Sequence, residues 1–113
     1  MSDLAGRDVL VQTPDVEAAC QFYEHVLGMK VFSRNAKMIG LEAGSFRLFL
    51  EPAGPLGPVF EIFVEDVNAA REELKAASCA VVAEDSRVPK CYIRDPFGLT
   101  FNIAQRATAA ASS

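Results

Sequence analysis

The chain contains the same short pattern twice. Residues 9–19 read VLVQTPDVEAA and residues 60–70 read FEIFVEDVNAA, so each copy is an apolar strand followed by an Asp-Val-x-Ala-Ala helix start. The two aspartates, Asp15 and Asp66, are 51 residues apart (66 − 15), close to half of the 113 residues. A repeat of this length predicts two copies of one supersecondary unit, with a cavity between them as the place for a functional site.

The composition narrows the class of protein. A chain of 113 residues, half of them hydrophobic, is expected to form one domain, residues 1–113, around a real core. No apolar run approaches the roughly 20 residues of a membrane span, and the first residues lack the features of a signal peptide. The net charge of −4 argues against nucleic acid as a partner and suits a neutral or cationic small molecule.

The cysteines and the single histidine carry no recognisable chemistry. Cys20, Cys79 and Cys91 are odd in number and form no Cys-x-x-Cys pair, so we expect packing residues in a reducing, cytoplasmic setting. His25 falls on the first predicted helix, and we expect it at the helix surface, away from any site.

Each copy predicts the order strand, helix, strand, strand, strand. Thr13 is expected to cap the first helix, with Pro14 in its first turn, and Gly28 to end it. The expected helices span residues 14–27 and 66–77. The expected strands are residues 8–13, 29–33, 37–42 and 46–51 in the first copy, and 59–64, 80–83, 90–94 and 99–105 in the second.

Turn-forming residues divide the chain between the copies. Residues 52–58 (PAGPLGP) are expected to be a linker between a first module, 7–51, and a second module, 59–105. Residues 106–113 are small and polar and are expected to be a flexible tail. The prediction is an α+β fold in which two tandem βαβββ modules place curved mixed sheets around a cup-shaped cavity.

This layout resembles the vicinal oxygen chelate superfamily, which includes glyoxalase I, extradiol dioxygenases, and fosfomycin and bleomycin resistance proteins. The resemblance covers about residues 7–105 and is carried by PDVEAA at 14–19, FYEHVLGMKV at 22–31, EDVNAA at 65–70 and DPFG at 95–98. It implies a site in the cup and, because open sheets of such modules often pair between chains, a homodimer. Whether modules pair within one chain or across two is left open.

The resemblance also identifies where metal-binding relatives hold their ion. Their ligands, His or Glu, lie seven residues before each helix-start aspartate and seven residues after the aspartate of the late Asp-Pro-x-Gly turn. With Gly44 aligned to Gly98 for the fourth position, these positions are Asp8, Val59, Asn102 and Leu48. One carboxylate, one amide and two aliphatic side chains are a poor set for zinc, nickel or iron, so we expect no metal and no other cofactor.

Strand alternation predicts which residues line the cup. In the first strand of each copy, we assign to the helix side the alternate apolar residues that begin with Val9 and Phe60. The residues between them then face the cup. Tyr92 is included although the sequence leaves the phase of its strand open, and no catalytic residue is assigned. The predicted ligand-binding residues are Asp8, Leu10, Gln12, Phe46, Leu48, Leu50, Val59, Glu61, Phe63, Tyr92 and Asn102.

The two carboxylates of this set have alternative interpretations. Glu61 among apolar walls should have a raised pKa or a cationic partner; alternatively it is solvated at the mouth of the cup or paired with an arginine such as Arg94. Asp8 either faces the cup or is an exposed residue at the start of its strand.

Two functions follow from these residues. The first is a small-molecule-binding protein of the glyoxalase/bleomycin resistance type, holding an apolar or cationic ligand, for example a drug, without a transition metal. The alternative is a metal-dependent lyase, isomerase, dioxygenase or thiol transferase, with an ion site built from Asp8, Glu61 and Asn102. A metal-free enzyme with Glu61 or Asp8 as general base is a variant of the alternative. A fold locates a site but does not identify its ligand.

Overall fold

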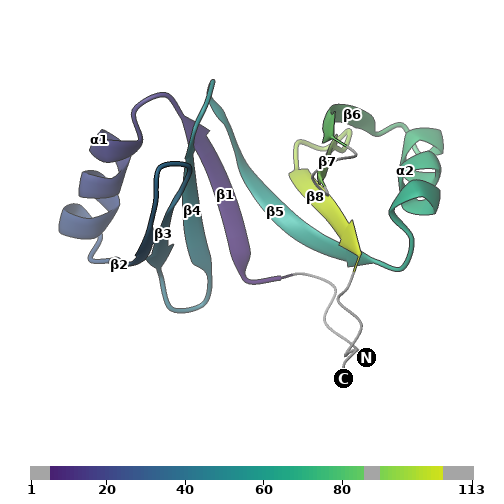
Figure 1. Ribbon diagram of the computed structural model, residues 1–113. Helices are drawn as coiled ribbons and strands as arrows, with labels where there is room; N and C mark the ends of the chain where they lie inside the picture. Colours follow the sequence, from purple (N-terminus) through teal and green to yellow (C-terminus); the bar gives the residue numbers. More distant parts are fainter. Residues whose placement is uncertain (1–5, 86–89, 106–113) are drawn as a thin grey trace. The chain divides into compact units, whose positions relative to one another are not determined.

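A computed structural model of the chain describes residues 6–85 and 90–105, which form two compact units (Figure 1). The first unit is residues 7–60, and the second contains Gly6 and the described residues from 61 onward. Each unit has the predicted order of one helix among strands, so the α+β prediction with two βαβββ modules is confirmed. The expected tail, residues 106–113, lies outside the described residues.

The first unit is a mixed sheet with one helix. Strand β1 (Asp8–Thr13) is followed by helix α1 (Val16–Gln21) and a π-helical turn (Phe22–Val26). Strands β2 (Lys30–Arg34), β3 (Ile39–Glu42) and β4 (Arg47–Pro52) come next, and β5 (Leu56–Val64) begins in this unit. The strand order is β2-β3-β4-β1-β5, with β1 parallel to β4 and the remaining pairs antiparallel.

The second unit repeats this arrangement. Strand β5 continues into it and is followed by helix α2 (Val67–Ala76), β6 (Ala80–Asp85), β7 (Lys90–Arg94) and β8 (Thr100–Gln105). The strand order is β5-β8-β7-β6, and β6, β7 and β8 are antiparallel neighbours. None of the helices in the described part of the chain is long and apolar enough to cross a membrane.

Strand β5 starts three residues earlier than the sequence predicts, inside the expected linker. Its second residue, Gly57, has a φ of +115°, and a Cβ there would come within 2.8 Å of the Leu10 carbonyl oxygen. The chain therefore passes so close to β1 that only glycine fits. Residues 56–58 of the Pro/Gly-rich segment therefore belong to the sheet.

The repeated aspartate is the N-cap of both helices. Asp15 Oδ1 accepts a hydrogen bond from the Ala18 amide at 3.0 Å, and Asp66 Oδ1 accepts one from the Ala69 amide at 3.1 Å. The expectation that Thr13 caps the first helix, with Pro14 inside it, is wrong because α1 begins only at Val16. An N-cap side chain accepts from an amide two or three residues later, and Asp15 does so with Ala18.

The end of the first helix also differs from a plain α-helix. After Gln21 the backbone widens, so the Leu27 amide bonds to the Phe22 carbonyl five residues back, at 3.3 Å. Gly28 follows with a φ of +81° and ends the helix as expected.

Each unit has its own core between helix and sheet. The first consists of Cys20, Ile39, Leu41, Leu48 and Leu50, with Val9 and Val11 among the side chains packed against it. The second consists of Cys91, Ile93, Phe101 and Ile103, with Ile62, Val64, Val67, Ala70, Leu74 and Cys79 packed against it. The three cysteines are free thiols that pack in these cores, as expected. Burial raises the pKa of the Cys91 thiol.

The late Asp-Pro-x-Gly segment forms the predicted turn into β8. Asp95 Oδ1 accepts from the amides of Leu99 and Phe97 at 3.0 and 2.9 Å, and these bonds, with a weaker one from Gly98, hold the pKa of Asp95 below its usual value. The turn is therefore organised by one ionised side chain.

The N-caps generate a stability prediction. Replacing Asp15 or Asp66 by Ala should lower the free energy of unfolding by about 1 kcal/mol, while Asn should nearly preserve it, because Asn also accepts the helix amide. Urea unfolding followed by circular dichroism measures the effect. Glu65→Ala, at the exposed residue beside Asp66, is the control and should change little. Wild-type stability in Asp66→Ala would show that the cap contributes nothing.

Candidate functional site

Each sheet has one face under its helix and one face that points away from it, which we call the distal face. In β1, Val9 and Val11 pack into the core under the helix. Because side chains alternate along a strand, the distal face of the first unit receives Asp8, Leu10 and Gln12, as predicted. Val59 is in register with Leu10, lies on the same face and is buried.

The prediction for β4 is wrong by one residue. Phe46, Leu48 and Leu50 were expected to line the cup, but they lie in or against the core on the helix side. The distal residues of this strand are therefore Arg47, Phe49 and Glu51.

The reason is the length of a turn. Glu42 pairs with Arg47, five residues later, whereas Arg94 pairs with Thr100, six residues later. Aligning the turn glycines of the two repeats therefore shifts the register by one, which moves every side chain to the other face. The counterpart of Asn102 is Phe49, not Leu48.

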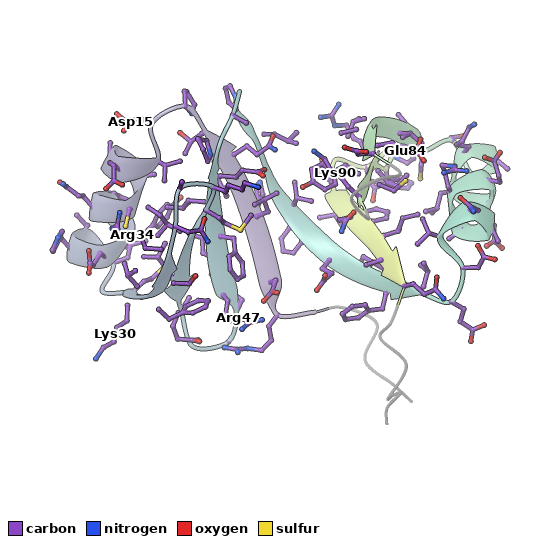
Figure 2. The ribbon with its side chains drawn as sticks, viewed as in Figure 1. Asp15, Lys30, Arg34, Arg47, Glu84 and Lys90 are labelled. Atoms are coloured by element: carbon purple, nitrogen blue, oxygen red, sulfur yellow. The ribbon has the colours of Figure 1, made fainter. Side chains whose placement is uncertain are left out.

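Arg47, the first residue of β4, contacts an acidic and two aromatic side chains on the distal face of the first unit (labelled in Figure 2). Its Nε and Nη2 donate to Asp8 Oδ1 and Oδ2 at 2.8 and 3.1 Å, a two-point contact that fixes the guanidinium plane. The guanidinium carbon is 5.6 Å from the ring centroid of Phe32 and 5.7 Å from that of Phe49. These distances are within the range of cation–π attraction.

The two rings meet above a glycine. Phe32 and Phe49 are 5.7 Å apart, edge to face, at 84°. A Cβ on Gly40 would lie 2.8 Å from Phe32 Cζ and 3.0 Å from Phe49 Cε1, so the rings occupy the space that any larger residue would need. Phe32 is 47% exposed, which leaves an apolar ring surface open to a ligand. We call Phe32, Phe49 and Arg47 the aromatic shelf.

Acidic side chains border the shelf. Glu42 accepts from the Gly44 amide at 2.9 Å and pairs with Arg7 at 2.7 Å. The Gly44 amide chiefly, and then the charges of Arg7 and Arg47, lower the pKa of Glu42. Glu51 accepts from the neutral Gln12 amide at 2.7 Å. Glu51 therefore retains an uncompensated charge among the described residues.

The distal face of the second unit is also polar and aromatic. Phe101 and Ile103 are in the core, which confirms that Asn102 faces away from the helix. Tyr92 is in register with Asn102, so its open phase is now settled on the distal face. Lys90 Nζ is 5.0 Å from the Tyr92 ring centroid (Figure 2 labels Lys90), and Asn102 Oδ1 accepts from the Cys91 amide at 2.9 Å.

Glu61 and Phe63 complete this face on β5. Ile62 and Val64 pack in the core, so the residues between them point away. Gly6 donates its amide to the Glu61 carbonyl at 3.0 Å. A Cβ on Gly6 would collide with Glu61 Oε1 and lie 3.3 Å from Phe63 Cε2. The Glu61 carboxylate is partly buried against the Gly6 backbone.

The residues at the family's metal-ligand positions do not fit a metal ion. In the corrected register they are Asp8, Phe49, Val59 and Asn102. Asp8 uses both oxygens on Arg47, and Asn102 uses its oxygen on the Cys91 amide. Phe49 and Val59 have no donor atom. In the described ranges, no three His, Cys, Asp or Glu side chains come together as a metal site would require. His25 is largely exposed on the first helix end, as expected.

Sequence reasoning placed Asp8, Leu10, Gln12, Val59, Glu61, Phe63 and Asn102 on the face where the structure has them. It missed Phe32, Arg47, Phe49 and Glu51. The signal that would have found Arg47 and Phe49 is the one-residue difference between the two turns. Phe32 carries no such signal, because it reaches Phe49 across a bulge between β2 and β3.

The fold is α+β, with two consecutive βαβββ modules, and the comparison with protein families agrees with it. The sequence profile of the Glyoxalase/Bleomycin resistance protein/Dioxygenase superfamily matches residues 7–103, so the chain belongs to that superfamily. None of the curated proteins compared with the chain matches it.

Solved structures share the fold at low sequence identity. A superfamily member from Vibrio splendidus 12B01 is 18% identical, covering 90% of this chain and 99% of that chain, with a TM-score of 0.61. A variant of homoprotocatechuate 2,3-dioxygenase from B. fuscum is 19% identical over 93% of this chain and 33% of its own, with a TM-score of 0.61. A Mn(II)-bound glyoxalase from Novosphingobium aromaticivorans is 23% identical over 94% and 42%, with a TM-score of 0.57.

The aromatic shelf generates a packing prediction. Gly40→Ala should lower the free energy of unfolding by about 1 kcal/mol, because the new methyl group must displace Phe32. In a Phe32→Ala background the same substitution should cost less. Urea unfolding of the wild type, the two single variants and the double variant measures this coupling. Gly54→Ala, where a Cβ meets nothing within 4 Å, is the control. An equal cost in both backgrounds would contradict the contact.

Proposed function

We propose that the chain is a small-molecule-binding protein of the glyoxalase/bleomycin resistance type, which binds an apolar or cationic ligand, for example a drug, without a transition metal. The observation that carries the proposal is the aromatic shelf on the distal face of the first unit. There, an arginine held by Asp8 lies against two phenylalanine rings, one of which is half exposed.

The shelf suits a flat apolar ligand. Aromatic rings bind other rings by offset or edge contacts, and covering an exposed ring removes apolar surface from water. Asp8 neutralises Arg47, so the pair adds no net charge that would favour an anion. Glu51 lies two residues along the same strand face from Phe49 and has only the neutral Gln12 amide as its partner among the described residues. A cationic group on the ligand would find its counter-charge there.

The contacts at the ligand positions favour binding over metal-dependent catalysis. A lyase, isomerase, dioxygenase or thiol transferase of this family type would need donor atoms free to coordinate an ion. Asp8 would have to give up a two-point ion pair, and Asn102 would have to give up a backbone amide. We therefore place the binding function first. The metal-bound glyoxalase among the similar structures is the reason to test the alternative directly.

Two further parts of the proposal concern the setting of the protein. A reducing, cytoplasmic compartment is supported by three free thiols, two of them fully buried. A homodimer is supported by the family resemblance, because the open sheets of such modules often pair between chains. Both are measured simply, by localisation of a tagged chain and by light scattering.

Ligand titrations test the proposal. Ethidium, a planar cation, and phenanthridine, its uncharged parent ring system, should both bind, as measured by calorimetry and by a rise in melting temperature. Phe49→Ala and Phe32→Ala should each weaken both ligands about tenfold, because each removes one aromatic contact. Glu51→Gln should weaken ethidium alone.

Phe97→Ala is the matched control, since Phe97 is an exposed phenylalanine of the second unit. It should leave both affinities unchanged. Failure of a panel of aromatic and cationic drugs to bind, or binding that is indifferent to Phe32 and Phe49, would overturn the proposal.

A further inference from the structure

The second unit contains an apolar cavity on the helix side of its sheet, on the face opposite its distal face. Its volume is about 310 Å³, and its walls come from α2, β5, β8 and the residue before β8. One of the lining side chains is charged, and the others are apolar. The lining residues are Ile62, Val64, Ala70, Glu73, Leu74, Leu99, Phe101 and Ile103.

The cavity follows from how the second repeat differs from the first. At the 51-residue offset, Arg71 stands where the first unit has Cys20, and Leu74 where it has Tyr23. Cys20 is fully buried in the first core and Tyr23 packs against that core. Arg71 instead turns aside to pair with Glu84 (labelled in Figure 2) and Glu72, and α2 has no fully buried residue. The space beneath the helix is therefore left unfilled.

The rim of the cavity carries an uncompensated charge. Glu73 occupies the position that Phe22 holds in the first repeat. Its neighbour Glu72 pairs with Arg71 and Lys75. The Glu73 carboxylate, in contrast, has no hydrogen-bond or ion-pair partner among the described residues. A negative charge beside an apolar cavity is complementary to a ligand that is apolar with one cationic end.

We propose that this cavity binds a small hydrophobic amine, with its apolar body beneath α2 and its ammonium group paired to Glu73. The cavity volume is at the lower end of the roughly 300–1,000 Å³ of ligand pockets, which suits a body of one or two rings. Leu99 is 41% exposed and lines the cavity, so the entrance is apolar as well. This site is separate from the aromatic shelf, which belongs to the other unit.

The test uses 1-naphthylmethylamine and its uncharged analogue 1-naphthylmethanol with the full chain. In ¹⁵N-labelled protein, both probes should give saturable shifts at the amides of Leu74, Leu99 and Phe101. Glu73→Gln should weaken the amine about fivefold, the size expected for one exposed ion pair, and leave the alcohol unchanged. Glu72→Gln, the matched control on the same helix, should affect neither probe.

A filling variant tests the shape of the site. Ala70→Leu should abolish the saturable shifts of both probes at the amides of Leu74, Leu99 and Phe101, because the larger side chain occupies the space that the rings need. Phe49→Ala weakens binding at the shelf but should leave the affinities measured at these second-unit amides unchanged, so the two proposals can fail separately. Shifts confined to the first unit, no saturable shifts, or equal weakening of both probes by Glu73→Gln would overturn the inference. The wild-type and Glu73→Gln results decide it even if Ala70→Leu does not fold.

Discussion

A strand side chain can face only one side of its sheet, and in each unit the apolar core lies on the side that the helix covers. Val9, Val11, Leu48 and Leu50 pack under α1, while Ile62, Val64, Phe101 and Ile103 pack in the core of the second unit. This burial sets the register of every strand. Because side chains alternate along a strand, the residues between these core positions, including Asp8, Arg47 and Asn102, point to the distal face. The candidate site is a consequence of where the core lies.

Local patterns in the sequence predicted most of the fold. The repeated Asp15 and Asp66 correctly predicted the two helices, and the DPFG sequence at 95–98 correctly predicted the turn into β8. The prediction failed for β4, where a turn that is one residue shorter changes the register. A shift of one residue moves every side chain of the strand to the other face, although the turn itself tolerates either length. The prediction also missed the contact between Asp8 and Arg47, which are 39 residues apart and are joined only by strand pairing.

The two repeats keep one scaffold and differ in the side chains that give it chemistry. The position that holds a carboxylate in the first repeat, Asp8, is the aliphatic Val59 in the second. The amide of Asn102 corresponds to the ring of Phe49. The helix position of the buried Cys20 is taken in the second repeat by Arg71, which pairs with Glu84 and leaves the cavity beneath α2.

Contacts within the protein occupy the donor atoms at the family's metal positions, Asp8 through Arg47 and Asn102 through the Cys91 amide. Elemental analysis of protein purified without added ions, followed by calorimetric titration with Mn²⁺, Ni²⁺ and Zn²⁺, tests it most directly. Because these donor atoms are engaged, we expect no stoichiometric metal and no saturable binding of any of the three ions. A stoichiometric ion that is lost in Asp8→Asn or Asn102→Ala would contradict it, and would place the chain among the metal-dependent members of its superfamily.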